Sequence, residues 1–292
     1  MGRKIKYKSI RAQSALTELN RKIPYGWDLN IYRGCQHGCE YCYAMYSHEY
    51  LGSNNFCDEI FVKENIVEEL EKELKSDRWK REVINIGGVT DSYQPAEAKY
   101  KLMPEILKLL IKYKTPAIIS TKSSLVLRDY DLIDELSRIT YINIAATITT
   151  MDEELRSLLE PGADSSENRF HMLSEFRKTN ASIGLHLMPI IPYITDSYEN
   201  LDAILSNAAK VKVDYALPGT LYLRGSTRKC FFEFIENRMP DKFELLKSLY
   251  KKGGAGEEYK NKLYVIVNQL RDYYEISSSY MKPMRDRMNK TP

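Results

Sequence analysis

Short apolar runs alternate with longer amphipathic segments along most of the chain. The apolar runs are rich in Ile and Val with few polar interruptions, which is typical of parallel strands covered on both faces. We expect six strands, at 28–32, 83–86, 116–120, 141–148, 182–188 and 213–217. Apolar residues spaced three and four apart predict helices at 59–75, 103–113, 129–138, 166–179 and 198–210. This alternation predicts βαβ units and a parallel sheet.

Six strand–helix repeats suit either a doubly wound sheet or an incomplete barrel, and in both folds ligands bind at the carboxyl ends of the strands. Thr150 and Glu153 have the spacing of a capping box, so a further helix is expected to start there. Beyond residue 225 the strand pattern fades. Helical patterns at 227–250 and 257–275 predict a C-terminal helical cap and tail over 226–292, with the last dozen residues loose.

Composition excludes several classes of protein. The 292 residues are 43% hydrophobic and 28% charged, as in an ordinary folded protein rather than a disordered one. No apolar run approaches the roughly 18 to 20 residues of a membrane helix. The N-terminus lacks the apolar core of a secretory signal. We therefore expect no membrane association and a cytoplasmic location.

The first 27 residues form a basic N-terminal arm. Five basic residues and no acidic one occur in the first eleven positions, namely Arg3, Lys4, Lys6, Lys8 and Arg11. A frayed, solvated terminus and a phosphate-contacting arm both explain this charge. The net charge of +3 is too mild to indicate a nucleic-acid partner by itself.

The cysteines carry the most specific signal. Cys35, Cys39 and Cys42 have the spacing C-x3-C-x2-C, and Cys57 and Cys230 stand apart as expected buried thiols. An odd number of cysteines without an export signal argues against a disulfide framework. Three thiolates so close together favour a soft metal or a cluster.

Two simpler explanations of the cysteine loop remain open. The cysteines are spaced to share one helical face, although Gly34 and Gly38 make such a helix poor. A zinc site would have to recruit His37 or Cys57 as its fourth ligand. A four-iron cluster usually takes four cysteines, so three would leave one iron open to a reactant.

The motif resembles that of the radical S-adenosylmethionine (SAM) superfamily, with an aromatic residue before its last cysteine and a position at the end of the first strand. Further blocks resemble the branch similar to spore photoproduct lyase and the "DNA repair photolyase" proteins, across roughly residues 28–225. These blocks lie at 30–35, 41–44, 90–95, 120–123, 127–129, 149–152, 159–161 and 189–192.

The resemblance implies a partial (β/α)6 TIM-like barrel of mostly parallel strands over 28–225. It implies a [4Fe-4S] cluster held by the three cysteines, with SAM as the second cofactor. An external one-electron reductant of the flavodoxin or ferredoxin type would start the reaction, and a 5′-deoxyadenosyl radical would abstract hydrogen from the substrate. Nucleic acid competes with a peptide or a small molecule as that substrate. A non-catalytic zinc or iron–sulfur protein is the alternative to an enzyme.

The resemblance also implies a set of SAM-binding residues. Lys122 and Thr147 would contact the methionyl carboxylate, and Asp91 the ribose. The carbonyls of a turn after the second strand would receive the SAM amine, and backbone atoms after the last cysteine would meet adenine. These last positions are Gly87, Gly88 and Tyr43. Each residue also has a plain structural explanation, such as a turn or an exposed lysine.

Tyr41 and Tyr43 match tyrosines implicated in a radical relay, so they are the catalytic candidates, although Tyr41 would also suit simple packing beside a cluster. Val89 stands where spore photoproduct lyases carry a hydrogen-donor cysteine, which places this chain beside those enzymes rather than among them. Glu160 and Arg169 form either an ion pair that shapes the site or a weak surface pair.

Overall fold

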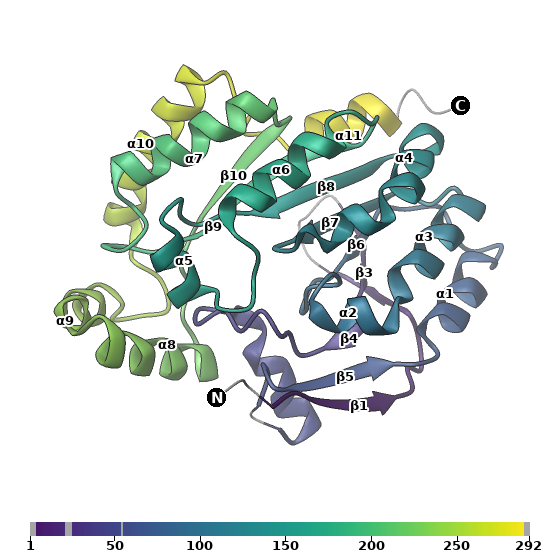
Figure 1. Ribbon diagram of the computed structural model, residues 1–292, viewed down its shortest axis with the longest axis horizontal. Helices are drawn as coiled ribbons and strands as arrows, with labels where there is room; N and C mark the ends of the chain where they lie inside the picture. The colour runs from purple at the N-terminus through teal and green to yellow at the C-terminus, as the bar shows by residue number, and fades with distance from the viewer. Residues whose placement is uncertain (1–3, 21–24, 54, 289–292) are drawn as a thin grey trace.

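A seven-stranded sheet forms the centre of the protein (Figure 1). The computed structural model describes residues 4–20, 25–53 and 55–288. The strands lie in the order β10-β9-β8-β7-β6-β3-β2, and every pair is parallel except the edge pair β2–β3. Their bounds are β2 Leu16–Glu18, β3 Trp27–Leu29, β6 Ile84–Ile86, β7 Ala117–Thr121, β8 Ile142–Thr147, β9 Ser182–Ile190 and β10 Tyr215–Thr220. The six parallel strands and the incomplete barrel are confirmed.

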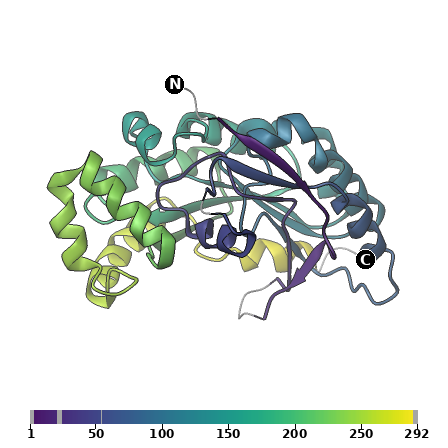
Figure 2. The same cartoon turned by 90° about the horizontal axis from the view of Figure 1, so that it is seen from below.

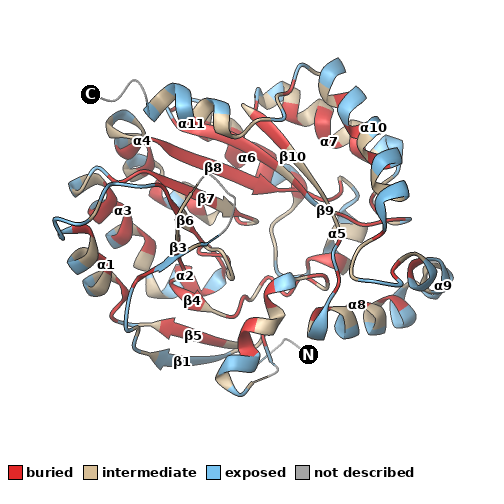
Figure 3. Ribbon diagram, turned by 180° about the vertical axis from the view of Figure 1, so that it is seen from behind, coloured by how far each residue is buried: buried red, intermediate tan, exposed pale blue. Residues whose placement is uncertain are grey.

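Helices cover the outer face of this sheet, and their outward surfaces are exposed (Figure 3). They are α1 Ile66–Leu74, α2 Pro95–Tyr100, α3 Leu102–Lys112, α4 Tyr130–Ile139, α6 Ser166–Phe176, α7 Tyr198–Val211 and α10 Glu257–Tyr273. The short helix α5 (Glu153–Leu159) instead packs through Leu159 in a cluster with Cys39 and Tyr41. Two 3-10 helices, η1 Tyr43–Leu51 and η2 Ser124–Asp129, follow the cysteine loop and β7. α10 packs against α7 and β10, so it continues the outer layer. In the part of the chain described here, no helix has the length and apolar character needed to cross a membrane.

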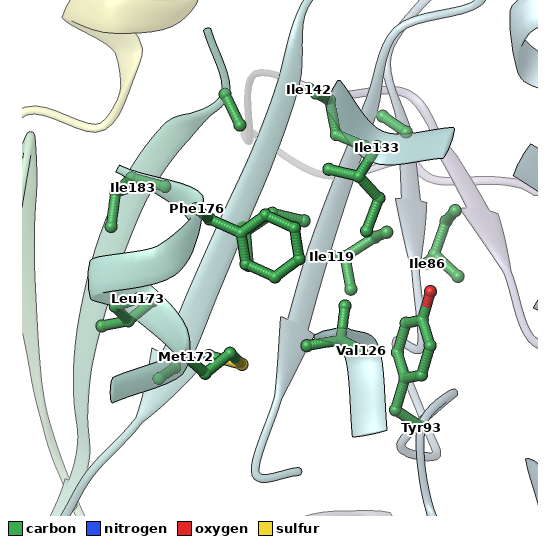
Figure 4. Packing of buried hydrophobic residues seen from close by; sticks show 14 of the residues in the cluster. Ile86, Tyr93, Ile119, Val126, Ile133, Ile142, Met172, Leu173, Phe176 and Ile183 are labelled. Atoms are coloured by element: carbon green, nitrogen blue, oxygen red, sulfur yellow. The ribbon is translucent and has the colours of Figure 1, made fainter. Parts of the chain in front are cut away.

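Alternation along the strands separates the core from the barrel interior. On β8, Ile142 and Ile144 point outward into the apolar core, whereas Thr147 lines a cavity on the inner side. Figure 4 shows this core, where strand isoleucines meet Met172, Leu173 and Phe176 of α6. Burial of the outer face therefore fixes the register and leaves the inner positions free for polar side chains.

A second, three-stranded sheet joins the N-terminal arm to the barrel. β1 (Lys6–Ile10) pairs in parallel with β5 (Glu59–Lys63), which pairs with β4 (Tyr32–Arg33) (Figure 2). The predicted helix at 59–75 is wrong over its first five residues, because the Ile60–Phe61–Val62 run is buried as the central strand. Residues 6–10 of the arm are likewise an ordered strand rather than frayed chain, whereas Arg3 lies outside the described residues.

The C-terminal region contains α8 (Gly225–Arg238), α9 (Pro240–Leu249) and α11 (Met281–Met288). The expectation of a loose tail is wrong over 281–288. Met284 is buried and packs with Val83, Ile118 and Tyr141, toward the amino ends of the strands. Residues 289–292 lie outside the described residues.

The predicted capping box is also wrong, because α5 begins after Asp152. The Asp152 side chain accepts a hydrogen bond from the Leu155 N–H at 2.9 Å. The Asp152 carboxylate, two residues closer to the helix than Thr150, satisfies one of its free N–H groups. The Glu153 carboxylate instead accepts a hydrogen bond from the Ser166 N–H.

Candidate active site at the carboxyl ends of the strands

A cavity of about 620 Å³ opens at the carboxyl ends of the barrel strands. Residues from the cysteine loop, from β6 to β10 and from the start of α8 line it. All ten predicted site residues are among them: Cys35, Cys39, Tyr41, Cys42, Tyr43, Gly87, Gly88, Asp91, Lys122 and Thr147. The fold thus brings together positions more than one hundred residues apart at the edge where α/β barrels bind ligands.

Side chains outside the motif hold the cysteine loop in shape. The Gln94 amide receives the Gln36 N–H and donates to the Gly34 carbonyl, both at 2.9 Å. Gly34 has φ +85°, and a Cβ there would lie 2.5 Å from the Glu59 carbonyl oxygen, so only glycine fits. Thr227 of α8 donates to the Cys42 carbonyl at 2.8 Å.

The three motif cysteines are enclosed, and their sulfur atoms influence one another. Burial raises the pKa of all three thiols, and the neighbouring cysteines raise the pKa of Cys35 and Cys39 further. The backbone N–H groups of His37 and Ala44 act in the opposite direction on Cys35 and Cys42.

Three soft sulfur donors line one cavity, and two of them accept hydrogen bonds from backbone N–H groups. This donor set fits an iron–sulfur cluster with three protein ligands. No three His, Cys, Asp or Glu side chains within the described ranges are arranged around a single metal ion.

His37 ties the loop to the rest of the site. Its Nδ1 lies 2.8 Å from the Gly162 carbonyl oxygen, and its Nε2 lies 3.0 Å from Asp91 Oδ2. The Asp91 carboxylate also accepts hydrogen bonds from the Thr121 hydroxyl and from the N–H groups of Tyr93 and Lys122. Both of its oxygens are therefore engaged inside the protein, where they join the loop to the end of β7.

Asp91 gives the protein a specific sensitivity to acid. Burial opposes its charge, but the charge and hydrogen bond of His37 and the two N–H groups lower the Asp91 pKa from 3.8 to about 2. The carboxylate therefore stabilises the fold above pH 4, and this stability is lost as the pH falls through 2. We expect Asp91→Asn to lower the free energy of unfolding by about 2 kcal/mol at pH 7. Urea titrations from pH 7 to 2 should show this difference shrinking with acid, and a constant difference would contradict it.

Lys122 places a cation in the cavity at the end of β7. Burial opposes its charge, but Cys39 and Glu160 raise the Lys122 pKa above its ordinary value. Its Nζ lies 5.8 Å from the centre of the Tyr41 ring. Lys122 therefore stays charged beside the cysteines. Thr147, at the end of the next strand, also lines the cavity.

The turn after β6 requires its glycines. Gly87 has φ +93°, and a Cβ on Gly88 would lie 2.3 Å from Asp28 Oδ2. The Tyr43 hydroxyl donates to the Gly88 carbonyl. Val89 follows in the cavity wall, and its N–H donates to Asn30 Oδ1.

Glu160 and Arg169 form a buried ion pair rather than a surface pair. Arg169 Nη2 lies 2.5 Å from Glu160 Oε2, and both side chains are 0% exposed. The Tyr41 hydroxyl donates to Glu160, and Thr149 donates to the same carboxylate oxygen at 3.2 Å. Burial opposes the carboxylate charge, but Arg169 and Lys122 lower the Glu160 pKa. Tyr41 is therefore fixed by a charged network that also reaches Lys122.

Other cavity residues were missed by the sequence reasoning. His186 follows the pattern of inward positions on β9, and Tyr222 and Arg224 follow the sixth strand, so their places in the chain carried a usable signal. Thr227 of α8 had no such signal. The expectation of a buried Cys230 is wrong because this residue is exposed on α8, whereas Cys57 is half-buried beside Cys35.

The chain is similar to proteins from distant organisms. It is 33% identical over 254 residues to the uncharacterized protein Rv2578c of Mycobacterium tuberculosis, covering 85% of this chain and 75% of that protein. It is 28% identical to the uncharacterized protein MJ0683 of Methanocaldococcus jannaschii, covering 84% and 88% of the two chains.

Among solved structures, spore photoproduct lyase complexed with dinucleoside spore photoproduct has a TM-score of 0.68 at 13% identity, covering 92% of this chain and 79% of that one. This likeness supports the shared barrel fold. The Radical SAM superfamily profile matches residues 29–204, which include the cysteine loop, the turn after β6 and Lys122. The chain belongs to the radical SAM superfamily, whose enzymes use a [4Fe-4S] cluster and S-adenosylmethionine.

Proposed function

We propose that this enzyme holds its cluster on Cys35, Cys39 and Cys42 and binds SAM across the neighbouring strand ends. When bound, the two cofactors supply a 5′-deoxyadenosyl radical that abstracts hydrogen from a substrate. The observation that carries the proposal is the convergence of the three thiols, the Gly87–Gly88 turn and Lys122 on one cavity. A non-catalytic zinc or iron–sulfur protein would not require the last two.

Each of the expected SAM-binding residues has a stated role in this proposal. Lys122 pairs with the methionyl carboxylate as a compact point charge, and the Thr147 hydroxyl adds a hydrogen bond to it. The carbonyls of Gly87 and Gly88 accept hydrogen bonds from the SAM amine. Backbone atoms at Tyr43 lie against the adenine.

Asp91 differs from the other SAM-binding candidates, because its carboxylate already accepts hydrogen bonds from protein groups. We propose that it positions Lys122 and the cysteine loop, and that any contact with the ribose uses only the remaining capacity of its oxygens.

Formation of 5′-deoxyadenosine tests the proposed activity. The protein is reconstituted with iron and sulfide under anaerobic conditions and then given dithionite and SAM. We expect 5′-deoxyadenosine to form in proportion to the iron bound. Its absence in a preparation with an intact cluster would overturn the proposal.

Replacement of Lys122 isolates its task in SAM binding. We expect Lys122→Met to raise the Kd for SAM about tenfold to hundredfold, because a charge-assisted hydrogen bond contributes about 1.5 to 3 kcal/mol. Equilibrium dialysis of the reconstituted protein with labelled SAM measures this change. Lys112→Met, which removes an exposed lysine on α3, serves as the matched control. Equal Kd values for the two variants would contradict the assignment.

We propose nucleic acid as the substrate class. Lys6 and Lys8 lie on the exposed strand β1, and Arg224, Tyr43 and Tyr222 line the mouth of the cavity with charged and aromatic surface. Spore photoproduct lyase, which shares the fold, is known in complex with a dinucleoside photoproduct. The near-neutral charge and Val89, in place of a hydrogen-donor cysteine, favour instead a peptide or small molecule.

The salt dependence of binding distinguishes these substrates. If phosphates are contacted, the affinity for single-stranded DNA should fall steeply with salt, with a slope of about 0.7 per contact in a log–log plot. Fluorescence anisotropy with a labelled oligonucleotide between 50 and 300 mM salt, roughly the range over which such contacts weaken, measures that slope. An affinity that does not change with salt concentration, or the absence of binding, would contradict a nucleic-acid substrate. We further propose a flavodoxin- or ferredoxin-type reductant and a cytoplasmic location.

A further inference from the structure

A chain of hydrogen bonds crosses the barrel interior below the cavity and ends on His186. Asn143 of β8 donates from its Nδ2 to the Ser182 carbonyl at 3.2 Å. The Tyr215 hydroxyl of β10 lies 3.0 Å from Asn143 Oδ1. His186 Nε2 of β9 lies 3.3 Å from the same Tyr215 hydroxyl. Three neighbouring strands therefore contribute one continuous polar path.

The donors in this path point in one direction. Because the Asn143 amide donates to a carbonyl, its oxygen must be the acceptor for Tyr215. The single phenolic proton of Tyr215 is then used, so its oxygen can only accept from His186. The proton on the neutral imidazole is thereby assigned to Nε2, and Nδ1 is left as an acceptor.

The fold makes room for this path. Asn143 and Tyr215 are 1% and 2% exposed, so their polar groups depend on each other for partners. Gly184, the β9 residue paired with Tyr215, has no side chain where a Cβ would lie 2.3 Å from the Tyr215 hydroxyl oxygen. A glycine thus admits the phenol to the centre of the barrel.

His186 is neutral and faces the site. Its ring lines the cavity, and among the residues that the structure describes no hydrogen bond to its Nδ1 is found. Burial, together with the positive charge of Lys122, lowers the His186 pKa to about 4. The proposed function assigns no role to His186.

We propose that His186 Nδ1 accepts a hydrogen bond from a neutral N–H group on a nucleobase of the substrate. The inference rests on the proposed function and specifies how its site selects a ligand. The nearby Lys122 charge disfavours a cationic donor, and an acceptor-only group would leave Nδ1 unpaired. A site built to pair with a donor rejects analogues that lack one.

Nuclear magnetic resonance of protein labelled with ¹⁵N in its histidine rings tests the proton assignment. With only four histidines in the chain, His186 is assigned by comparison with His186→Leu. We expect a protonated Nε2 and an unprotonated Nδ1 at pH 7. In Tyr215→Phe the two nitrogens should report mixed tautomers, whereas Tyr274→Phe, which removes a hydroxyl that donates to Asp202, should not change them. A protonated Nδ1 in the unaltered protein would overturn the inference.

Binding of nucleosides with and without base N–H groups tests whether the substrate donates a hydrogen bond to His186. The probes are the four deoxynucleosides and their counterparts methylated at the base N–H groups, with the reconstituted enzyme saturated with SAM. For the deoxynucleoside that binds most tightly, methylation should raise the Kd roughly tenfold or more, because a buried acceptor loses its partner. This penalty should vanish in His186→Leu and return in part in His186→Asn, whose Oδ1 can take the place of Nδ1.

The outcomes separate this inference from the proposed function. If 5′-deoxyadenosine forms but methylation has the same effect in the unaltered enzyme and in His186→Leu, the role of His186 is wrong and the SAM chemistry stands. If none of the deoxynucleosides binds, the nucleobase donor is overturned. If no 5′-deoxyadenosine forms with an intact cluster, the proposed function itself fails.

Discussion

Cys39→Ala is expected to abolish both the cluster and the formation of 5′-deoxyadenosine. Cys39 lies between the other two motif cysteines in the sequence and is buried beside Tyr41. Burial raises the Cys39 pKa, and the positive charge of Lys122 acts against that rise. A cluster held by two thiolates would expose two irons instead of one. Iron and sulfide assays, the visible absorption of the reconstituted protein and product analysis should all fall to background.

Cys230→Ala is the matched control for this substitution. It removes an exposed thiol on α8, away from the cavity lining, so iron content and product formation should equal those of the unaltered protein. A full complement of iron in Cys39→Ala would show that this thiol is no ligand. If Cys39→Ala with a full complement of iron also formed no product, this thiol would be needed for catalysis without holding the cluster.

Arg169→Leu is expected to lower the free energy of unfolding by about 3 to 5 kcal/mol, because it leaves the Glu160 carboxylate buried without its counter-charge. The lost hydrogen bonds add to this cost, since Arg169 also donates to the carbonyls of Thr147 and Asp164. Urea denaturation followed by circular dichroism measures the change. The double variant Arg169→Met with Glu160→Gln should recover part of the loss.

Arg138→Leu supplies the surface comparison. Arg138 pairs with Asp134 on α4 and is 67% exposed, so its loss should cost less than about 1 kcal/mol. If Arg169→Leu cost no more than Arg138→Leu, the buried pair would not hold Tyr41 in place by charge. The same experiment would then remove the reason for assigning Tyr41 a fixed position beside the cluster ligands.

The sequence predicted the barrel well because its strands are marked by local patterns. Runs such as 141–148 are apolar except at Asn143 and Thr147, and each is followed by an amphipathic helix. Residues 59–63 have the pattern of a helix because Ile60 and Val62 also suit the apolar stripe of α1. Pairing with β1, 53 residues earlier in the chain, and with β4 makes this segment a strand. Such non-local partners leave no periodic signal.

The candidate site was likewise predictable in one part and not in the other. The cysteine spacing and the residues at strand ends were visible because the motif and the topology both point to one edge of the sheet. The contact of His37 with Asp91, 54 residues later, was not visible, and it occupies a carboxylate that was expected to contact the ribose. Whether Glu160 and Arg169 were buried also depended on how α5 and α6 pack in the folded protein.

The anchoring of the cysteine loop bears on how the enzyme survives damage. Gln94, Thr227 and the His37–Asp91 contact hold the loop through protein groups alone. Small zinc domains, by contrast, unfold when their metal is removed. If oxygen or chelators remove the iron, the empty cysteine loop should therefore stay folded. The machinery that rebuilds clusters can then refill it without first refolding the chain.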